Sequence, residues 1–256
     1  MVEPKVFKSH LTVEFDENDV SLGDFILRSL DKFSDTELFV DCASGRKWTG
    51  AAMSQQVRRL ATRLIVELDM RPGDISCISY DHCDRTVALA LAIICAGGTV
   101  SCAYPHDPYP ELLYLARKTR PAFLFCARDR SHWGSQLHND LGNAHSLKAI
   151  VSMDNGELDI DFETLWIQET NSPEPTREMP QLPLAPYASI NEMLAFMSLS
   201  SGTTGLPKVI ASTHANCLAT SKQMSVSRRD RAREVPGDTD QAASQTITLS
   251  CSATLD

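Results

Sequence analysis

The most constraining feature of this chain is a regular alternation of helix-like and strand-like segments from residue 53 to residue 126. Residues 53–68 carry apolar side chains at helical spacing, and the Arg71-Pro72-Gly73-Asp74 segment ends that pattern. The apolar face comprises Val57, Leu60, Ala61, Leu64, Ile65 and Leu68. The pattern then predicts, in turn, a strand at 75–80, a helix at 84–96, a strand at 99–103, a helix at 110–119 and a strand at 122–126. Because these strands are apolar on both faces, we expect an α/β fold with mostly parallel sheets flanked by helices, and ligand sites at the carboxyl ends of the strands.

The flanking segments extend this pattern. We expect a helix at 22–30, then two short strands within 37–49 around a Ser44-Gly45 turn, a strand at 149–153 and a short helix at 162–169. Residues 1–20 are expected to be extended. Five prolines within 171–186 are too dense for a helix or a central strand and predict an exposed linker. Near the end of the chain, residues 245–255 alternate like one strand, for which the sequence offers no later partner.

One uncharged stretch, residues 86–105, has the length of a bilayer span. Its strongly apolar part is short, however, and it breaks at Gly97-Gly98 before a strand-like alternation. We therefore expect a buried helix, a glycine turn and a strand here, and no transmembrane segment.

Charge and cysteine usage narrow the classes of partner. The 24 basic and 33 acidic residues give a net charge of −9, which disfavours nucleic acid or an anionic membrane as the main partner. The eight cysteines form no CxxC pair and the histidines do not cluster with them, so we expect buried reduced thiols and no metal held by protein side chains alone. The first twenty residues contain no apolar secretory segment, which favours an intracellular protein, either cytoplasmic or peroxisomal.

The segment most suggestive of chemistry is SSGTTGLPK at residues 200–208, between a strand-like run at 193–199 and the apolar Val209-Ile210 pair. Two glycines allow backbone N–H groups to converge on an anion, hydroxyls add short donors, and Lys208 adds a positive charge. It is not a Walker A loop, because Pro207 occupies the position before the lysine that glycine takes in that motif. The alternative is a flexible surface turn; the strands on both sides favour a phosphate-binding loop.

SSGTTGLPK is similar to the signature loop of the adenylate-forming enzymes, a family that includes acyl-CoA synthetases, coumarate–CoA ligases and beetle luciferases. Residues 22–49, residues 71–126 and the Thr213-His214-Ala215-Asn216 segment also resemble that family, so the likeness covers about two hundred residues. The resemblance implies an incomplete large N-terminal domain. It also implies ATP, Mg²⁺ bound through ATP and coenzyme A as cofactors and co-substrate, with a carboxylic acid as substrate. The implied nucleotide contacts are Ser200, Ser201, Gly202, Thr203, Thr204, Gly205 and Lys208, with Lys208 balancing phosphate charge and no residue assigned to catalysis.

Three other features near the loop need an interpretation. Val209 stands where the family usually has glycine, so a backbone conformation reserved for glycine is not available just past Lys208. His214 is a conceivable catalytic base, but its setting favours a structural residue at a helix start capped by Thr213. A cluster of arginines interleaved with acids predicts a solvated loop rather than an anion site. Its members are Arg228, Arg229, Arg231 and Arg233.

The resemblance also sets the expected domain plan. Residues 1–225 form a partial AMP-binding N-terminal domain, residues 226–256 a polar loop and a truncated strand, and a small C-terminal domain is absent. The family's later nucleotide and ribose motifs do not occur in these 256 residues, so we expect a truncated carboxylate–CoA ligase that is weakly active or inactive alone. The alternative is a non-catalytic binding or regulatory form that associates with a full-length relative. Neither the acid nor the oligomeric state is specified by the sequence.

Overall fold

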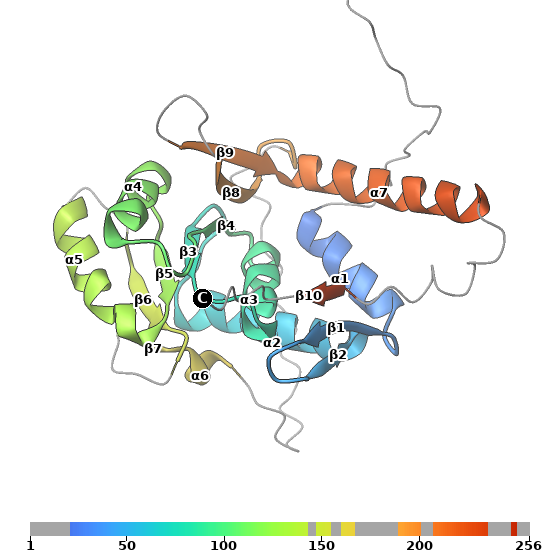
Figure 1. The fold of residues 1–256 in the computed structure, drawn as a ribbon, viewed down its shortest axis with the longest axis horizontal. Coiled ribbons are helices and arrows are strands. Elements are labelled where there is room, and N and C mark those ends of the chain that lie inside the picture. The colour runs from blue at the N-terminus through green and yellow to red at the C-terminus, as the bar shows by residue number, and fades with distance from the viewer. Residues whose placement is uncertain are drawn as a thin grey trace, which may run out of the picture.

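The computed structural model describes residues 21–142, 147–154, 160–166, 189–200, 207–234 and 247–249. Between residues 50 and 126 its helices and strands alternate as the sequence predicts (Figure 1). In chain order the elements are α1 Leu22–Lys32, β1 Glu37–Asp41, β2 Lys47–Thr49, α2 Gly50–Glu67, β3 Ile75–Ser79, α3 Asp84–Cys95, β4 Thr99–Cys102, α4 Tyr109–Thr119, β5 Phe123–Cys126, η1 Arg128–Arg130, α5 Ser131–Leu141, β6 Ala149–Ser152, β7 Ile160–Asp161, α6 Phe162–Leu165, β8 Leu194–Ser200, β9 Lys208–Thr213, α7 His214–Glu234 and β10 Ile247–Leu249.

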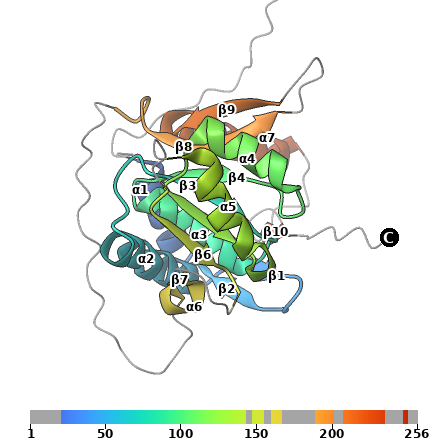
Figure 2. The same cartoon turned by 90° about the vertical axis from the view of Figure 1, so that its left-hand side faces the viewer.

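The larger sheet has seven strands in the order β7-β6-β5-β3-β4-β8-β9. All its pairings are parallel except that of β8 with β9, which confirms the expected mostly parallel α/β fold. The chain moves from β3 to β4 in one direction and then returns past β3 to β5. Because parallel crossovers are right-handed, this reversal puts α3 on one face of the sheet and α4 and α5 on the other (Figures 1 and 2).

Each face of the sheet has its own apolar core. On the first face, α1, α2 and α3 bury a cluster that includes Leu60, Leu64 and Ile93. On the second face, α4 and α5 bury a smaller cluster around Leu112, Leu115 and Leu137, which we call the α4 cluster. The helical stripe expected at residues 53–68 is confirmed, since its leucines and Val57 lie in the first core.

The uncharged stretch folds as expected into α3, a glycine turn and β4. Gly97 ends the helix with a φ of 78°, in the left-handed region that favours glycine. A Cβ on Gly98 would lie 2.9 Å from Ile93 Cγ2, so the turn also depends on the missing side chain there. Within the described ranges, every helix is too short or too polar to span a bilayer.

A second sheet of three strands, in the order β10-β1-β2, lies beside the first core. The hairpin of β1 and β2 confirms the two strands expected around Ser44-Gly45. The strand expected near the chain end is present as the shorter β10, and it pairs in parallel with the earlier strand β1, with Phe39 opposite Ile247. That partner comes from about two hundred residues earlier, which no local pattern reveals.

Other expectations need correction. The arginine cluster does not lie in a loop, because α7 continues through it to Glu234, and the loop expected from residue 226 is therefore helical up to that point. The helix expected at 162–169 is shorter, Phe162–Leu165, and α5 and β7 were not expected at all. The lead-in at 1–20 and the linker at 171–186 lie outside the described residues.

The cysteines differ in burial, so only part of the expectation holds. Cys83 and Cys217 are half-buried. Cys77, Cys95 and Cys126 are buried, whereas Cys42 and Cys102 are exposed. All seven cysteines within the described ranges are free thiols. Exposure at Cys42 follows from its place in the short turn between β1 and β2, which leaves the apolar core.

Candidate functional site

The two ends of the SSGTTGLPK segment form the base of a β-hairpin. β8 ends at Ser200, β9 begins at Lys208, and these two residues lie opposite each other in the antiparallel register. Ser200 Oγ donates a hydrogen bond to the Lys208 carbonyl at 3.3 Å. Residues 201–206, which include the expected contacts Ser201, Gly202, Thr203, Thr204 and Gly205, lie outside the described part of the chain.

The parallel pairing of β8 determines where this hairpin opens. Val100 in β4 is opposite Phe196, and Thr99 Oγ1 donates to the Leu194 carbonyl at 2.9 Å. β8 therefore runs in the same direction as β3, β4 and β5, and its carboxyl end reaches the same edge of the sheet as theirs. That edge is where parallel α/β sheets bind their ligands.

Lys208 brings a positive charge to this edge. Its side chain is exposed, and no acidic side chain in the described part of the chain forms an ion pair with it. A lysine at the end of a glycine-rich hairpin can therefore direct its ammonium group toward a bound anion without first breaking a salt bridge.

Val209 does not disturb the hairpin. It is extended, pairs with Leu199 across the strands, and packs with Leu199 against the α4 cluster. Among the described residues, Asp69 and Arg120 are the only non-glycine residues with positive φ, so the backbone past Lys208 needs no glycine. At this position, where the resembling family usually has glycine, the Val209 side chain thus anchors β9.

Tyr114 in α4 contacts the hairpin from the neighbouring helix. Its hydroxyl donates a hydrogen bond to the Pro207 carbonyl at 2.6 Å, immediately before Lys208. The two residues are 93 positions apart in the chain, so sequence reasoning missed this contact. The only signal available was that Tyr114 lies on a helix expected to cover the sheet.

The structure places His214 at the first position of α7, as a structural residue. Thr213 Oγ1 accepts from the Asn216 N–H at 3.2 Å, and Asn216 Oδ1 accepts from the Thr213 N–H at 3.1 Å, so Thr213 caps the helix as expected. His214 is buried, and its Nδ1 accepts from the Leu22 N–H at 3.0 Å. Its ring is therefore directed at the start of α1.

The arrangement brings Lys208 and the two ends of a glycine-rich segment to one edge of the sheet. Within the described ranges, no three His, Cys, Asp or Glu side chains converge closely enough to hold a metal ion. The class that the fold defines is thus a parallel α/β protein with a glycine-rich hairpin at the carboxyl edge of its sheet.

Comparison with known proteins identifies the family. The sequence model of the family described as AMP-binding enzyme matches residues 26–253, most of the chain. The chain therefore belongs to the AMP-binding enzyme family, as the resemblance of its loop implied.

Individual relatives agree with this membership. The chain is 27% identical over 224 residues to 4-coumarate–CoA ligase 4 of Arabidopsis thaliana, covering 82% of this chain and 36% of that protein. It is 27% identical over 209 residues to 4-coumarate–CoA ligase-like 6 of Oryza sativa subsp. japonica, covering 78% and 30%. The chain thus spans about a third of the length of these curated relatives.

The solved structures support the same fold. The luciferase-like enzyme of the mealworm Zophobas morio superimposes with a TM-score of 0.64 at 20% identity, covering 79% of this chain and 45% of that structure. At this level of identity the likeness concerns the fold. The described residues therefore share the fold of the corresponding part of that enzyme.

Proposed function

We propose that residues 200–208 bind the phosphates of ATP, and that the chain is the loop-bearing part of an ATP-dependent carboxylate–CoA ligase. The observation that carries this proposal is the hairpin base. Ser200 and Lys208 are paired at the carboxyl edge of the sheet, and the Lys208 ammonium group has no acidic partner among the described residues. The activity itself is that of the longer relatives, two of which are named as 4-coumarate–CoA ligases or ligase-like proteins.

The electrostatics explain why a local cation is needed. The chain carries a net charge of −9, and both ATP and a carboxylate are anions. A binding site on such a chain therefore requires positive charge and N–H donors concentrated at one place. Lys208 supplies that charge, and the glycines at 202 and 205 are the positions at which backbone N–H groups can approach phosphate oxygens.

The proposed reaction has two steps. A carboxylate oxygen attacks the α-phosphorus of ATP, the bond to the bridging oxygen breaks, and an acyl-adenylate and pyrophosphate result. The thiol of coenzyme A then loses its proton to solvent and attacks the acyl carbon, and the bond between that carbon and the AMP oxygen breaks to release AMP. Mg²⁺, when bound through ATP, neutralises phosphate charge in the first step. The positive charge of Lys208 also stabilises the negative charge of the phosphate chain. Lys208 transfers no proton.

We further propose that the 256 residues alone catalyse this reaction weakly. These residues correspond to about a third of the length of the two named relatives, and phosphoryl and adenylyl transfer depend chiefly on positioning. A phosphate-binding loop alone can therefore bind ATP, but it does little to align the carboxylate with the α-phosphorus.

The test is ATP–pyrophosphate exchange, measured with the purified chain in the presence of 4-coumarate and of a long-chain fatty acid as separate substrates. We expect slow exchange or none, together with measurable MgATP binding. Exchange at a rate comparable with that of a full-length ligase would overturn the proposal that these 256 residues are only weakly active. Binding of ATP with no exchange and stable association with a full-length relative would instead favour the non-catalytic alternative.

A further inference from the structure

We propose that Tyr114 is a positioning residue for the phosphate loop, and that its hydroxyl orients the peptide unit that joins Pro207 to Lys208. This inference rests on the proposed function, because it concerns how the same loop presents its groups to phosphate. It adds a residue from α4, far from the loop in sequence, to the groups on which ATP affinity depends.

The contact is short and connects two separate elements. Tyr114 lies near the middle of α4, and its hydroxyl is 2.6 Å from the Pro207 carbonyl oxygen. The side chain is half-buried, so the bond is partly shielded from competing water. Of the hairpin loop residues, Pro207 is the last before β9, and a restraint at this position acts directly on the start of that strand.

The geometry of the peptide unit explains why a carbonyl contact affects Lys208. The carbonyl of Pro207 and the N–H of Lys208 belong to one planar trans peptide unit and point in opposite directions. Fixing the carbonyl toward Tyr114 therefore fixes the direction of the Lys208 N–H and the start of its side chain. Pro207 has its own φ fixed by its ring, so rotation about ψ is the main freedom that the Tyr114 bond removes.

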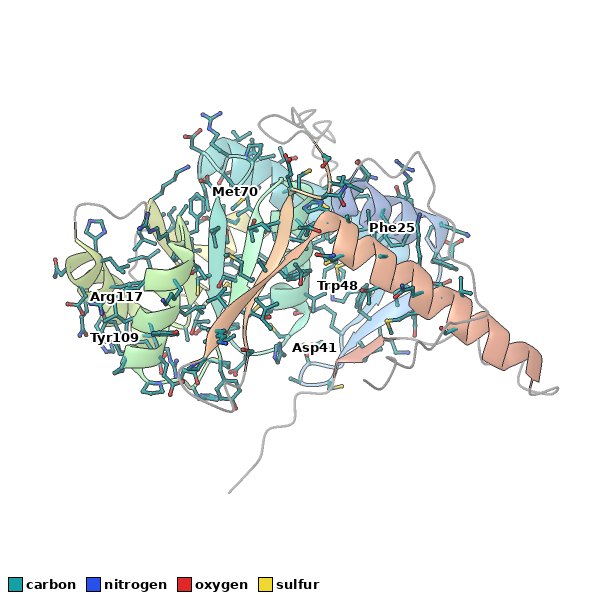
Figure 3. The ribbon with its side chains drawn as sticks, turned by 90° about the horizontal axis from the view of Figure 1, so that it is seen from above. Phe25, Asp41, Trp48, Met70, Tyr109 and Arg117 are labelled. Carbon is teal, nitrogen blue, oxygen red and sulfur yellow. The ribbon has the colours of Figure 1, made fainter. Side chains whose placement is uncertain are left out.

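The surrounding packing makes α4 a rigid support for this bond. Leu199 and Val209, on either side of the hairpin base, pack against the α4 cluster that contains Leu112 and Leu115. Figure 3 shows the hairpin beside α4, which carries the labelled Tyr109 and Arg117. The apolar contacts hold the hairpin against α4, and the hydroxyl then sets the orientation of one peptide unit within it.

Lys118 holds the ring of Tyr114 from the next helical turn. Its Nζ lies 5.7 Å from the ring centroid, at the spacing expected for residues four apart in a helix. This contact restricts the tyrosine side chain in the direction of the hairpin.

A purely structural bond is the competing interpretation, and α4 offers a matched control. Tyr109, in the first turn of the same helix, donates a hydrogen bond from its hydroxyl to Asp140 Oδ2 in α5 at 2.7 Å. Tyr109→Phe therefore removes one inter-element hydrogen bond of α4, as Tyr114→Phe does, without touching the hairpin. A general loosening of α4 would affect both variants alike.

The experiment measures binding of MgATP, tripolyphosphate and adenosine by calorimetry to the full 256-residue chain and its variants. We expect Tyr114→Phe to weaken MgATP and tripolyphosphate about fivefold, as the loss of one hydrogen bond implies, and to leave any adenosine binding unchanged. Tyr109→Phe should bind all three like the wild type. In a Lys208→Ala background, Tyr114→Phe should cause a smaller further loss than in the wild type, because the side chain whose start the peptide unit fixes has been removed while its N–H remains.

Hydrogen exchange of the unliganded protein provides a second measurement that does not depend on ATP. Amides of residues 208–210 should exchange faster in Tyr114→Phe than in the wild type or in Tyr109→Phe. If Tyr114→Phe exchanged these amides and bound the phosphate ligands like the wild type, the role of Tyr114 would be overturned. The proposed function would remain intact. Equal weakening by both tyrosine variants would also overturn it. Failure of the wild type to bind either phosphate ligand would instead overturn the proposed function, and the role of Tyr114 with it.

Discussion

The Leu22 backbone N–H, at the start of α1, donates a hydrogen bond to Nδ1 of the buried His214 ring at 3.0 Å. A ring nitrogen that accepts carries no proton, so the imidazole is neutral with its hydrogen on Nε2. Nε2 has no hydrogen-bond partner among the described residues. Burial lowers the pKa of His214, and the Asp24 carboxylate opposes this effect. The contact between α1 and α7 therefore depends on an uncharged histidine.

This contact predicts a loss of stability in mild acid. Because the pKa of His214 is lower in the folded than in the unfolded chain, the unfolded chain takes up the proton first as the pH falls below about 6.5. The free energy of unfolding should then decrease by at most about 1.4 kcal/mol per pH unit until the folded-state pKa is passed. Denaturant titrations of the wild type between pH 8 and pH 4.5 measure this loss.

His214→Asn isolates the contribution of that ring. Asparagine offers an acceptor near the position of Nδ1 but does not titrate, so the variant should lose stability less steeply than the wild type over the same pH range. His138→Asn, at an exposed position of α5, serves as the control and should follow the wild type. Identical slopes for His214→Asn and the wild type would contradict this account of the contact.

Asp84 predicts a second stability effect, at the junction of the small sheet and α3. Its buried carboxylate accepts from Trp48 Nε1 at 3.0 Å and from Arg46 at 2.9 Å. Asp84→Ala should lower the free energy of unfolding by about 1–3 kcal/mol, because it leaves the buried indole N–H without an acceptor. Glu67→Ala, which removes an i,i+4 partner of Arg63, should cost about 0.5 kcal/mol or less. Denaturant unfolding compares the two, and equal costs would contradict the buried network.

The thiols should react in two groups. Burial raises the pKa of Cys95 and of Cys126 to about 12, and it also raises the pKa of Cys77, so all three remain protonated near neutral pH. Cys42 is exposed in the turn between β1 and β2. Brief treatment of the native protein with iodoacetamide at pH 7.5, followed by peptide mass analysis, should modify Cys42 and spare those three. Modification of Cys77 at a similar rate would show that the sheet opens readily.

The sequence predicted the elements whose signals are local. The stripe of α2 and the apolar strands β3 to β5 have clear periodicity, and they establish the parallel α/β fold. α5 was missed because its apolar positions are sparse, with Leu137 as its buried leucine and Gly134 beside Ile150. The helical continuation of α7 was missed because its dense charges resemble those of a solvated loop.

The site shows the same division between local and long-range information. The composition of residues 200–208 predicted a phosphate loop, and the structure adds the pairing of Ser200 with Lys208 at its base. The contact from Tyr114 depends on how α4 crosses the sheet, 93 residues earlier in the chain, and the pairing of β10 with β1 spans more than two hundred residues. Contacts of this kind follow from the topology of the whole chain and leave no periodic pattern in the sequence.

The most direct test of the central claim is a titration of the wild type, Lys208→Ala and Lys47→Ala with MgATP. Lys47 is an exposed lysine of the small sheet that pairs with Glu37 at 2.9 Å, so it controls for the loss of one positive charge. We predict that Lys208→Ala weakens MgATP binding at least tenfold, that Lys47→Ala binds like the wild type, and that wild-type affinity falls as salt is raised. Equal affinity of Lys208→Ala and the wild type would contradict the assignment of residues 200–208 as the phosphate-binding loop.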